Sequence, residues 1–429
     1  MQNKFSDTMT FDDAVKLAGP MQFNLMMKPA GSLCNLDCQY CYYLDKSEIY
    51  GGREPKMSDE MLETCIREYI DANDVREVTF NWHGGEPLVL GLGFYEKAVR
   101  LQQKYCGDKL IHNTIQTNGT LLDADFASFF RDNAFLVGVS IDGPRDIHDK
   151  YRKDKGGAPT FDKVIRGIET LYRYGVEYNT MSTVNKASEG RGQEVYSFLK
   201  QLGTRYMQFM PVVEHVKYPG DATGRKRSVM RPYIVSPDTE GAEIAPWSVS
   251  SLAYGKFMCD IFDCWVLSDV GRYFVNLFDC TLANWCGALP GTCAYAETCG
   301  GNSILEHNGD LYPCDHFVYP KYRIGNINET PLREMMSDER QAKFGIDKRN
   351  GLPHKCMACE YLFACHGECP KHRFNVTESG QKGLNALCEG YLKFYRHVAP
   401  YMDQMKQLLS DRKAPAGVMS WARLRNLQR

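Results

Sequence analysis

The sequence lacks an excess of charge of either sign. Its 51 Lys and Arg residues stand against 53 Asp and Glu residues, so the formal net charge is −2. This balance excludes a bulk electrostatic attraction to nucleic acid or to an anionic membrane surface. Long hydrophobic runs are also missing, because the most apolar stretches, such as residues 135–141, are far too short to span a bilayer.

The first twenty residues are acidic and contain no apolar run. They therefore do not resemble a secretory signal, and we expect a cytoplasmic protein. Hydrophobic residues make up 43% and charged residues 24% of the chain, which is typical of a globular protein. A length of 429 residues leaves room for about two or three domains.

Cysteine, in contrast, is abundant, with 17 residues. The odd count excludes complete disulfide pairing within one chain. In a reducing compartment structural disulfides do not persist. Cysteines at short, fixed spacings there indicate metal or redox chemistry.

Strand-like and helix-like segments alternate between about residues 22 and 213. The predicted strands are 22–28, 75–82, 112–118, 135–142, 177–185 and 206–213. The predicted helices are 58–72, with Ser58 as N-cap, 93–105, 123–133, 160–175 and 192–203. This order predicts βαβ units and a parallel sheet, whose ligands bind at the carboxyl ends of the strands. Periodicity alone does not decide whether the sheet closes toward a barrel.

The rest of the chain is less regular. Residues 214–248 are polar and rich in Pro, Gly and charge, which predicts a long loop. Its basic cluster, Lys217 through Arg227, is expected to be a solvated surface, with partner binding as the alternative. Further predictions are a helix at 252–271, an amphipathic helix at about 387–410, and a basic tail with Arg423, Arg425 and Arg429.

Cys34, Cys38 and Cys41 form a C-x3-C-x2-C motif directly after the first predicted strand. Three thiolates can hold three irons of a cubane cluster and leave the fourth iron open to another ligand. Zinc would prefer a closed set of four ligands. Three buried cysteines in a loop, with Tyr40 as ordinary packing, are the remaining alternative.

A second motif, His83 to Pro87 (HGGEP), follows the next predicted strand. Together the two motifs resemble the radical S-adenosylmethionine (SAM) superfamily, in which SAM chelates the open iron and is cleaved to a 5′-deoxyadenosyl radical. The resemblance implies a partial (β/α)6 barrel. It also implies SAM contacts by Tyr40, Gly85, Glu86, Ser140, Arg152 and Val213. The alternatives for the motif and its neighbours are an ordinary turn, a strand-end serine and a surface arginine.

Eight cysteines recur at ordered spacings between residues 293 and 388. Structural zinc is one interpretation. The pattern, including Gly309, also resembles the SPASM domain with two auxiliary 4Fe-4S clusters, for a total of three clusters with the SAM-binding one. The resemblance assigns Cys293, Cys299, Cys314 and Cys369 to the first auxiliary cluster, and Cys356, Cys359, Cys365 and Cys388 to the second. The other six cysteines are expected to be buried, with Cys286 as a spare ligand: Cys65, Cys106, Cys259, Cys264, Cys280 and Cys286.

We therefore expect four segments along the chain. They are a radical SAM core at 1–235, a connecting helical segment at 236–285, a SPASM domain at 286–392, and a C-terminal helix with a basic tail at 393–429.

Over nearly its whole length the chain resembles the anaerobic sulfatase-maturating enzymes, through stretches such as KPAGSLCNLDCQYCYY (28–43) and GDLYPCDHFVYP (309–320). The resemblance implies oxidation of a cysteine or serine in a sulfatase to Cα-formylglycine. It implies Asp315 as the proton acceptor, and an electron that leaves through the auxiliary clusters. The partners would be a sulfatase polypeptide and an electron donor such as a flavodoxin or ferredoxin. Some family members have Gln at the position of His83.

Two alternatives remain at this point. One is a SPASM-type enzyme that forms thioether or C–C crosslinks in a ribosomally made peptide. The other is a zinc-binding interaction module without enzymatic activity.

Overall fold

The computed structural model describes residues 21–51, 56–218 and 232–427. The chain forms two compact units that interleave along the sequence. The first unit contains the residues up to Ser140, Tyr151–Tyr178 and Thr298–Asn350, and the second contains Ile141–Lys150, Asn179–Glu297 and the residues from Gly351 onward. The segment that bears on secretion, residues 1–20, lies outside the described residues.

The first unit contains a sheet of seven strands in the order β4-β3-β2-β1-β11-β12-β13. The neighbours from β4 to β11 pair in parallel, whereas β12 and β13 pair antiparallel. The strands are β1 (Asn24–Lys28), β2 (Glu77–Trp82), β3 (Leu110–Thr117), β4 (Leu136–Ser140), β11 (Asn302–Glu306), β12 (Asp310–Tyr312) and β13 (Gly325–Asn326). Four of the predicted strands are thereby confirmed, with bounds within about two residues.

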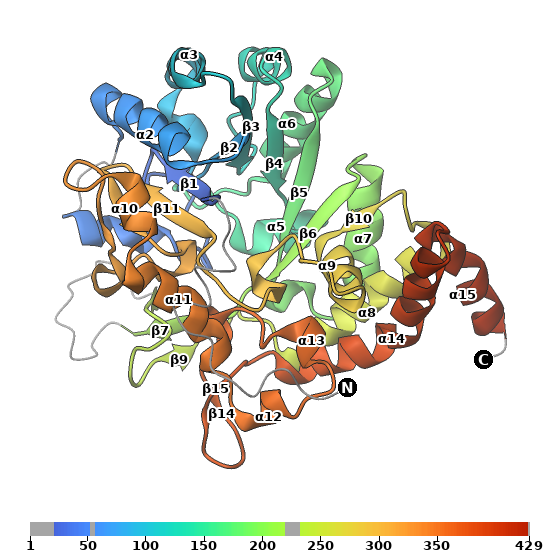
Figure 1. Ribbon diagram of the computed structural model, residues 1–429. Helices are drawn as coiled ribbons and strands as arrows, with labels where there is room; N and C mark the ends of the chain where they lie inside the picture. Colours follow the sequence, from blue (N-terminus) through green and yellow to red (C-terminus); the bar gives the residue numbers. More distant parts are fainter. Residues whose placement is uncertain (1–20, 52–55, 219–231, 428–429) are drawn as a thin grey trace. The chain divides into compact units, whose positions relative to one another are not determined.

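Four helices of this unit, α2 (Asp59–Ala72), α3 (Leu92–Tyr105), α4 (Ala124–Asp132) and α6 (Phe161–Tyr174), follow the predicted positions, whereas α10 (Leu332–Met336) and α11 (Glu339–Asn350) were not predicted (Figure 1). Ser58 is the N-cap of α2, as predicted, because its hydroxyl accepts the backbone N–H of Met61 at 3.2 Å. Alternate residues of β2 are buried, including Phe80 and Trp82.

The second unit contains β5 (Tyr178–Val184), β6 (Tyr206–Pro211) and β10 (Phe274–Val275), which pair in parallel in the order β5-β6-β10. Its longest helices, α8 (Ser251–Ser268) and α14 (Cys388–Ser410), pack against each other (Figure 1). The other helices and strands are α5 (Arg145–Tyr151), α7 (Gly192–Gln201), α9 (Asn276–Trp285), α12 (His354–Met357), α13 (Leu362–Cys365), α15 (Val418–Leu427), β14 (Asn375–Val376) and β15 (Lys382–Leu384).

The prediction of one long loop at 214–248 was wrong in part. Residues 214–248 include a small antiparallel sheet of β8 (Tyr233–Ile234), β7 (His215–Lys217) and β9 (Glu243–Ile244). Most of the predicted basic cluster falls in 219–231, outside the described residues. In the basic tail, Arg423 and Arg425 lie on the helix α15, and Arg429 lies outside the described residues. Short segments of this kind carry too little periodicity to be recognised.

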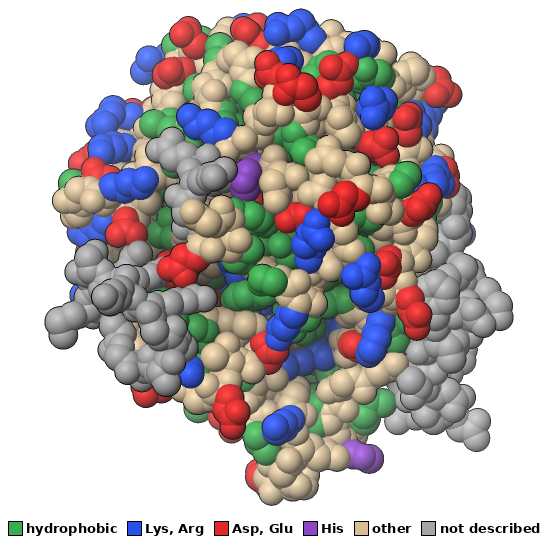
Figure 2. All heavy atoms as spheres, turned by 90° about the vertical axis from the view of Figure 1, so that its left-hand side faces the viewer, with side chains coloured by type: hydrophobic (Ala, Val, Ile, Leu, Met, Phe, Trp, Pro, Cys, Tyr) green, Lys and Arg blue, Asp and Glu red, His purple; other side chains and the backbone are tan. Residues whose placement is uncertain are grey.

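The surface agrees with the nearly neutral composition. On the face drawn in Figure 2, Lys and Arg side chains are interspersed with Asp and Glu side chains. Among the described helices none is long and apolar enough to cross a membrane.

Candidate active site at the carboxyl ends of β1 to β4

The loop that carries the three cysteines is attached to the Gly-Gly turn by backbone hydrogen bonds. The N–H of Gly85 donates to the carbonyl of Gly31 at 2.7 Å, and the N–H of Glu86 donates to that of Leu33 at 2.8 Å. A Cβ atom on Gly85 would lie 2.3 Å from the carbonyl oxygen of Leu33. Glycine is therefore required at this position so that two backbone segments can approach each other.

The residues after β3 hold the same loop from another side. The Asn118 side-chain amide donates to Asn35 Oδ1 at 2.8 Å and lies 3.8 Å from the Sγ of Cys34. The Asn35 amide in turn donates to the hydroxyl of Thr120 at 2.8 Å. The N–H of Leu36 donates to the same sulfur at 3.3 Å. N–H groups directed at a cysteine sulfur are common around iron–sulfur clusters, where they stabilise the bound thiolate.

The carboxylate of Glu86 is fully buried and bonded to the chain itself. It accepts hydrogen bonds from the Thr117 hydroxyl at 2.7 Å, from Asn118 N–H at 2.7 Å and from Leu88 N–H at 3.0 Å. Burial raises the pKa of Glu86 to about 7, although these three donors act in the opposite direction. Glu86 thus ties the turn to the end of β3.

Two cysteines of the motif, Cys34 and Cys41, have an environment that suits a metal cluster. Burial raises the pKa of the Cys34 thiol to about 12. Burial also raises the pKa of Cys41. The N–H groups of Tyr43 and Leu44 and the charges of Arg152 and Lys28 act in the opposite direction and lower it. A bound iron would stabilise the thiolate form of such thiols.

The other predicted SAM contacts in the first unit have defined neighbours. The Arg152 side chain is buried, with its guanidinium carbon 5.5 Å from the centroid of the Tyr40 ring. The Ser140 hydroxyl, at the end of β4, accepts the Gln116 side-chain amide at 3.0 Å. Val213 belongs to the second unit, where it is buried two residues after β6.

Asp315 follows Cys314 directly and is surrounded by donors that the sequence did not reveal. Lys28 Nζ lies 2.5 Å from Asp315 Oδ1, and the Tyr42 hydroxyl donates to Oδ2. Burial would raise the pKa of Asp315, but the charge of Lys28 holds it below its usual range. The carboxyl group is therefore ionised at neutral pH.

His83 completes this cluster as a neutral ring. Its Nδ1 accepts the N–H of Gly84 at 2.8 Å and faces Lys28 Nζ at 3.3 Å. Burial, with the charge of Lys28, lowers the pKa of His83 to about 4. Because Nδ1 is an acceptor, the ring proton of neutral His83 lies on Nε2. One signal in the sequence points to this cluster, since a lysine ends an otherwise apolar strand at Lys28.

The cysteines predicted for the second auxiliary cluster all lie in the second unit. Cys356 and Cys388 belong to one apolar cluster with Leu362 and Leu384. Burial raises the pKa of Cys356 to about 11 and that of Cys365 to about 12, and the charge of Cys388 contributes to both shifts. Burial likewise raises the pKa of Cys388, with a contribution from Cys359. The four thiols thus influence one another, as expected for ligands of one cluster.

The cysteines predicted for the first auxiliary cluster are divided between the units. Cys299 and Cys314 lie in the first unit, whereas Cys293 and Cys369 lie in the second. In the described part of the chain, no three Cys, His, Asp or Glu side chains are arranged as a finished metal site. The agreement with cluster binding therefore rests on the chemistry and surroundings of the thiols.

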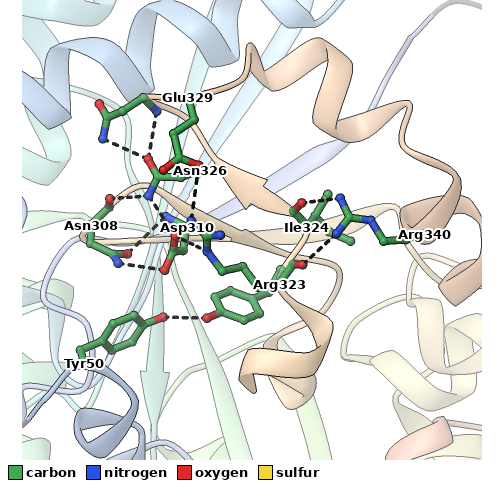
Figure 3. Close-up of polar contacts among 10 residues, drawn as sticks. Tyr50, Asn308, Asp310, Arg323, Ile324, Asn326, Glu329 and Arg340 are labelled. Atoms are coloured by element: carbon green, nitrogen blue, oxygen red, sulfur yellow. Dashed lines mark hydrogen bonds and ion pairs between the residues drawn. The ribbon is translucent and has the colours of Figure 1, made fainter.

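The glycine of the predicted SPASM pattern shapes the hairpin that leads to Cys314. Gly309 has a φ of +87°, and a Cβ there would lie 2.9 Å from Ile327 Cγ2. The adjacent Asp310 accepts hydrogen bonds from the Arg323 guanidinium at 2.6 Å and from the Asn326 amide at 2.9 Å (Figure 3). These bonds fix the start of β12, the strand that ends two residues before Cys314.

The prediction that the six remaining cysteines are buried was only partly correct. Cys65, Cys259 and Cys280 are buried, whereas Cys106 and Cys264 are half-buried and Cys286 is exposed. Cys286 follows the last residue of α9, and a residue just beyond a helix end is not held against the core.

We expect Gly85→Ala to prevent the cysteine loop from docking on the turn, because the added methyl group would overlap the backbone of Leu33. The variant should lose iron from the first cluster and about 1–3 kcal/mol of stability. Iron content after anaerobic reconstitution and thermal unfolding would measure both effects. Gly93→Ala, in α3, is the matched control because nothing lies within 4 Å of a Cβ there. Equal iron contents in the two variants would contradict this account of Gly85.

Comparison with known proteins agrees with this geometry. Residues 29–199 match the model of the radical SAM superfamily, and residues 297–360 match that of the SPASM iron–sulfur cluster-binding domain. A serine-type anaerobic sulfatase-maturating enzyme of Bacteroides thetaiotaomicron is 49% identical over 92% of this chain and 94% of its own length. A cysteine-type enzyme of Clostridium perfringens is 31% identical over 88% of this chain and 96% of its own.

A solved structure, native anSMEcpe with bound AdoMet and the Cp18Cys peptide, is 29% identical and superimposes with a TM-score of 0.77. The match covers 90% of this chain and 99% of that one. The radical SAM and SPASM domains imply 4Fe-4S clusters, auxiliary ones included. The chain belongs to the anaerobic sulfatase-maturating enzymes, a family of radical SAM proteins with a SPASM domain.

Proposed function

We propose that serine, rather than cysteine, is the residue that this chain oxidises to Cα-formylglycine in a sulfatase. The support is the 49% identity with the Bacteroides serine-type relative, against 31% or 32% with cysteine-type relatives of similar coverage; two Klebsiella serine-type relatives are 33% identical. A peptide-crosslinking activity has weaker support. A SuiB structure with its precursor peptide is only 14% identical, and such a likeness concerns the fold alone.

Asp315 is the proposed proton acceptor, and the arrangement of its donors carries this assignment. Bound SAM, when cleaved at its cluster, supplies the radical that removes a hydrogen atom from the substrate Cβ. Formation of the aldehyde then requires loss of the hydroxyl proton and of one electron, which the auxiliary clusters would accept. Asp315 is ionised, and its two donors leave a second lone pair on each oxygen for the substrate hydroxyl.

The cluster ligands and SAM contacts are proposed as the motifs assign them. Cys34, Cys38 and Cys41 would hold the SAM-binding cluster. Cys293, Cys299, Cys314 and Cys369 would hold the first auxiliary cluster, and Cys356, Cys359, Cys365 and Cys388 the second. Tyr40, Gly85, Glu86, Ser140, Arg152 and Val213 would surround SAM, with Glu86 acting as the anchor of its turn.

The partners and the location are also proposals. A sulfatase polypeptide would be the substrate, and a flavodoxin or ferredoxin would supply electrons to the cytoplasmic enzyme. We keep the proposed functional regions, with boundaries at residues 235, 285 and 392. These regions differ from the two compact units, which interleave along the sequence.

Asp315→Asn removes the proton acceptor while it preserves the size of the side chain. We expect formylglycine formation to fall by roughly 10²- to 10⁴-fold, with SAM cleavage and iron content retained in the folded protein, and the free energy of unfolding to fall because Lys28 loses its counter-charge. Mass spectrometry of a sulfatase-motif peptide and chromatography of 5′-deoxyadenosine would measure the two products. Asp108→Asn, at an exposed position of the same unit, is the control. Product formation by Asp315→Asn at the rate of this control would remove Asp315 from its role.

Two peptides that differ only in serine or cysteine at the modified position test the substrate preference. Under identical reducing conditions, we expect the serine peptide to give the higher kcat/KM. A higher value for the cysteine peptide would show that the preference is reversed. A lack of aldehyde from both peptides, despite SAM cleavage, would support the crosslinking alternative instead.

Iron analysis tests the ligand assignment. Three 4Fe-4S clusters correspond to about twelve irons per chain. The triple change of Cys34, Cys38 and Cys41 to Ala should remove about four of these irons and abolish SAM cleavage. Cys106→Ala, outside every motif, should change neither value. Stoichiometric zinc without a visible chromophore in the wild-type protein would support a zinc module.

A further inference from the structure

A second carboxylate lies beside the Asp315 cluster. Lys28 ends β1 and Glu306 ends β11, and the two residues are direct partners in the parallel pairing of these strands. Partners in a parallel ladder place their side chains on the same face of the sheet. Both side chains are fully buried. The sheet therefore brings an ammonium group and a carboxylate to one buried location.

Tyr43 connects the two groups. Its hydroxyl donates a hydrogen bond to Glu306 Oε1, and Lys28 Nζ lies over its ring, 3.8 Å from the centroid. The ring itself is held by packing in an apolar cluster with Ile304, Tyr312 and Val318. A phenol that donates to a carboxylate gains electron density in its ring, which strengthens attraction to a cation above its face.

Lys28 needs such support. Its side chain has four flexible methylene groups, and its ammonium group faces three things: Asp315 Oδ1, His83 Nδ1 and the Tyr43 ring. His83 accepts without adding a negative charge, because its ring is neutral. The ammonium group of Lys28 therefore lies between the face of the Tyr43 ring and the carboxylate of Asp315.

The remaining surroundings of Glu306 point to the same connection. Its Oε2 lies 3.5 Å from His307 Nδ1 but has no hydrogen-bond donor among the described residues. The hydroxyl of Tyr50, which donates to that of Tyr312 at 3.3 Å (Figure 3), lies near the carboxylate without bonding to it. Asp310 on β12 contributes a further negative charge nearby. Among the described residues, the hydroxyl of Tyr43 is thus the hydrogen-bond donor that connects Glu306 to the Lys28 cluster.

We infer that Glu306 is a positioning residue for the reaction: acting through Tyr43 and Lys28, it holds the Lys28 ammonium group against the carboxylate of Asp315. The inference rests on the proposed role of Asp315 as proton acceptor. It adds a chain of three contacts, from Glu306 to the Tyr43 hydroxyl, from the Tyr43 ring to Lys28, and from Lys28 to Asp315.

Glu306→Gln and Tyr43→Phe each weaken the first contact with a minimal change of shape. We expect both variants to retain their irons and SAM cleavage, while formylglycine formed per 5′-deoxyadenosine falls on the order of tenfold, because misplaced catalytic groups lose rate steeply. The KM for the peptide should stay at the wild-type value. Tyr50→Phe is the matched control, since it removes a neighbouring hydroxyl outside the chain of contacts, and it should behave as wild type.

The double variant separates positioning from a general structural effect. If both residues act through one hydrogen bond, the combined loss should equal that of either single change, whereas independent structural damage would multiply. A wild-type product ratio in Tyr43→Phe, or multiplied losses in the double variant, would overturn the inference. Should Glu306→Gln fail to fold, Tyr43→Phe still decides the first of these outcomes.

Failure of the proposed function would look different. In that case the wild-type protein would form no formylglycine, or Asp315→Asn would keep the wild-type product ratio. The role of Glu306 is therefore tested only once wild type and Asp315→Asn have been shown to differ in formylglycine formed per 5′-deoxyadenosine.

Discussion

The buried ammonium group of Lys28 is the constraint around which the candidate active site is arranged. A lysine side chain without exposure to solvent requires partners, because an unpaired buried charge is strongly destabilising. Asp315 supplies the opposite charge, His83 supplies a neutral acceptor, and Tyr43 supplies the face of a ring. The three partners come from separate segments of the chain, so satisfying one charge brings those segments together.

The same pairing has a consequence for chemistry. An ion pair with Lys28 keeps Asp315 ionised in a site where burial alone would protonate it. A carboxylate kept ionised in this way can accept a proton without first losing one. The contact between Lys28 and Asp315 therefore contributes to stability and to function. Glu306, which we infer to orient Lys28, matters to both for the same reason.

The cysteine loop depends on a second constraint, which is the close approach of backbones. Gly85 allows its turn to hydrogen-bond with the residues before Cys34, and the Glu86 carboxylate anchors that turn to β3. The sequence suggested that these residues contact a ligand directly. In the structure Glu86 bonds to the protein, because its three donors belong to Thr117, Asn118 and Leu88. The motif thus positions the loop that carries Cys34, Cys38 and Cys41.

Local pattern was enough to predict β1 to β4 and the helices between them, since strand and helix periods depend on neighbouring residues, but it did not predict β11 and β12, which carry Glu306 and lead to Asp315. It was also enough to single out the eleven cysteines, whose spacing is a property of the chain alone. The contacts of Lys28, Tyr42, Tyr43 and Glu306 were not predictable. Lys28 and Glu306 are 278 positions apart in sequence, and only the pairing of β1 with β11 makes them neighbours. The sequence by itself determined which groups are present, and the tertiary structure decided which of them share a buried charge, because that depends on strand register.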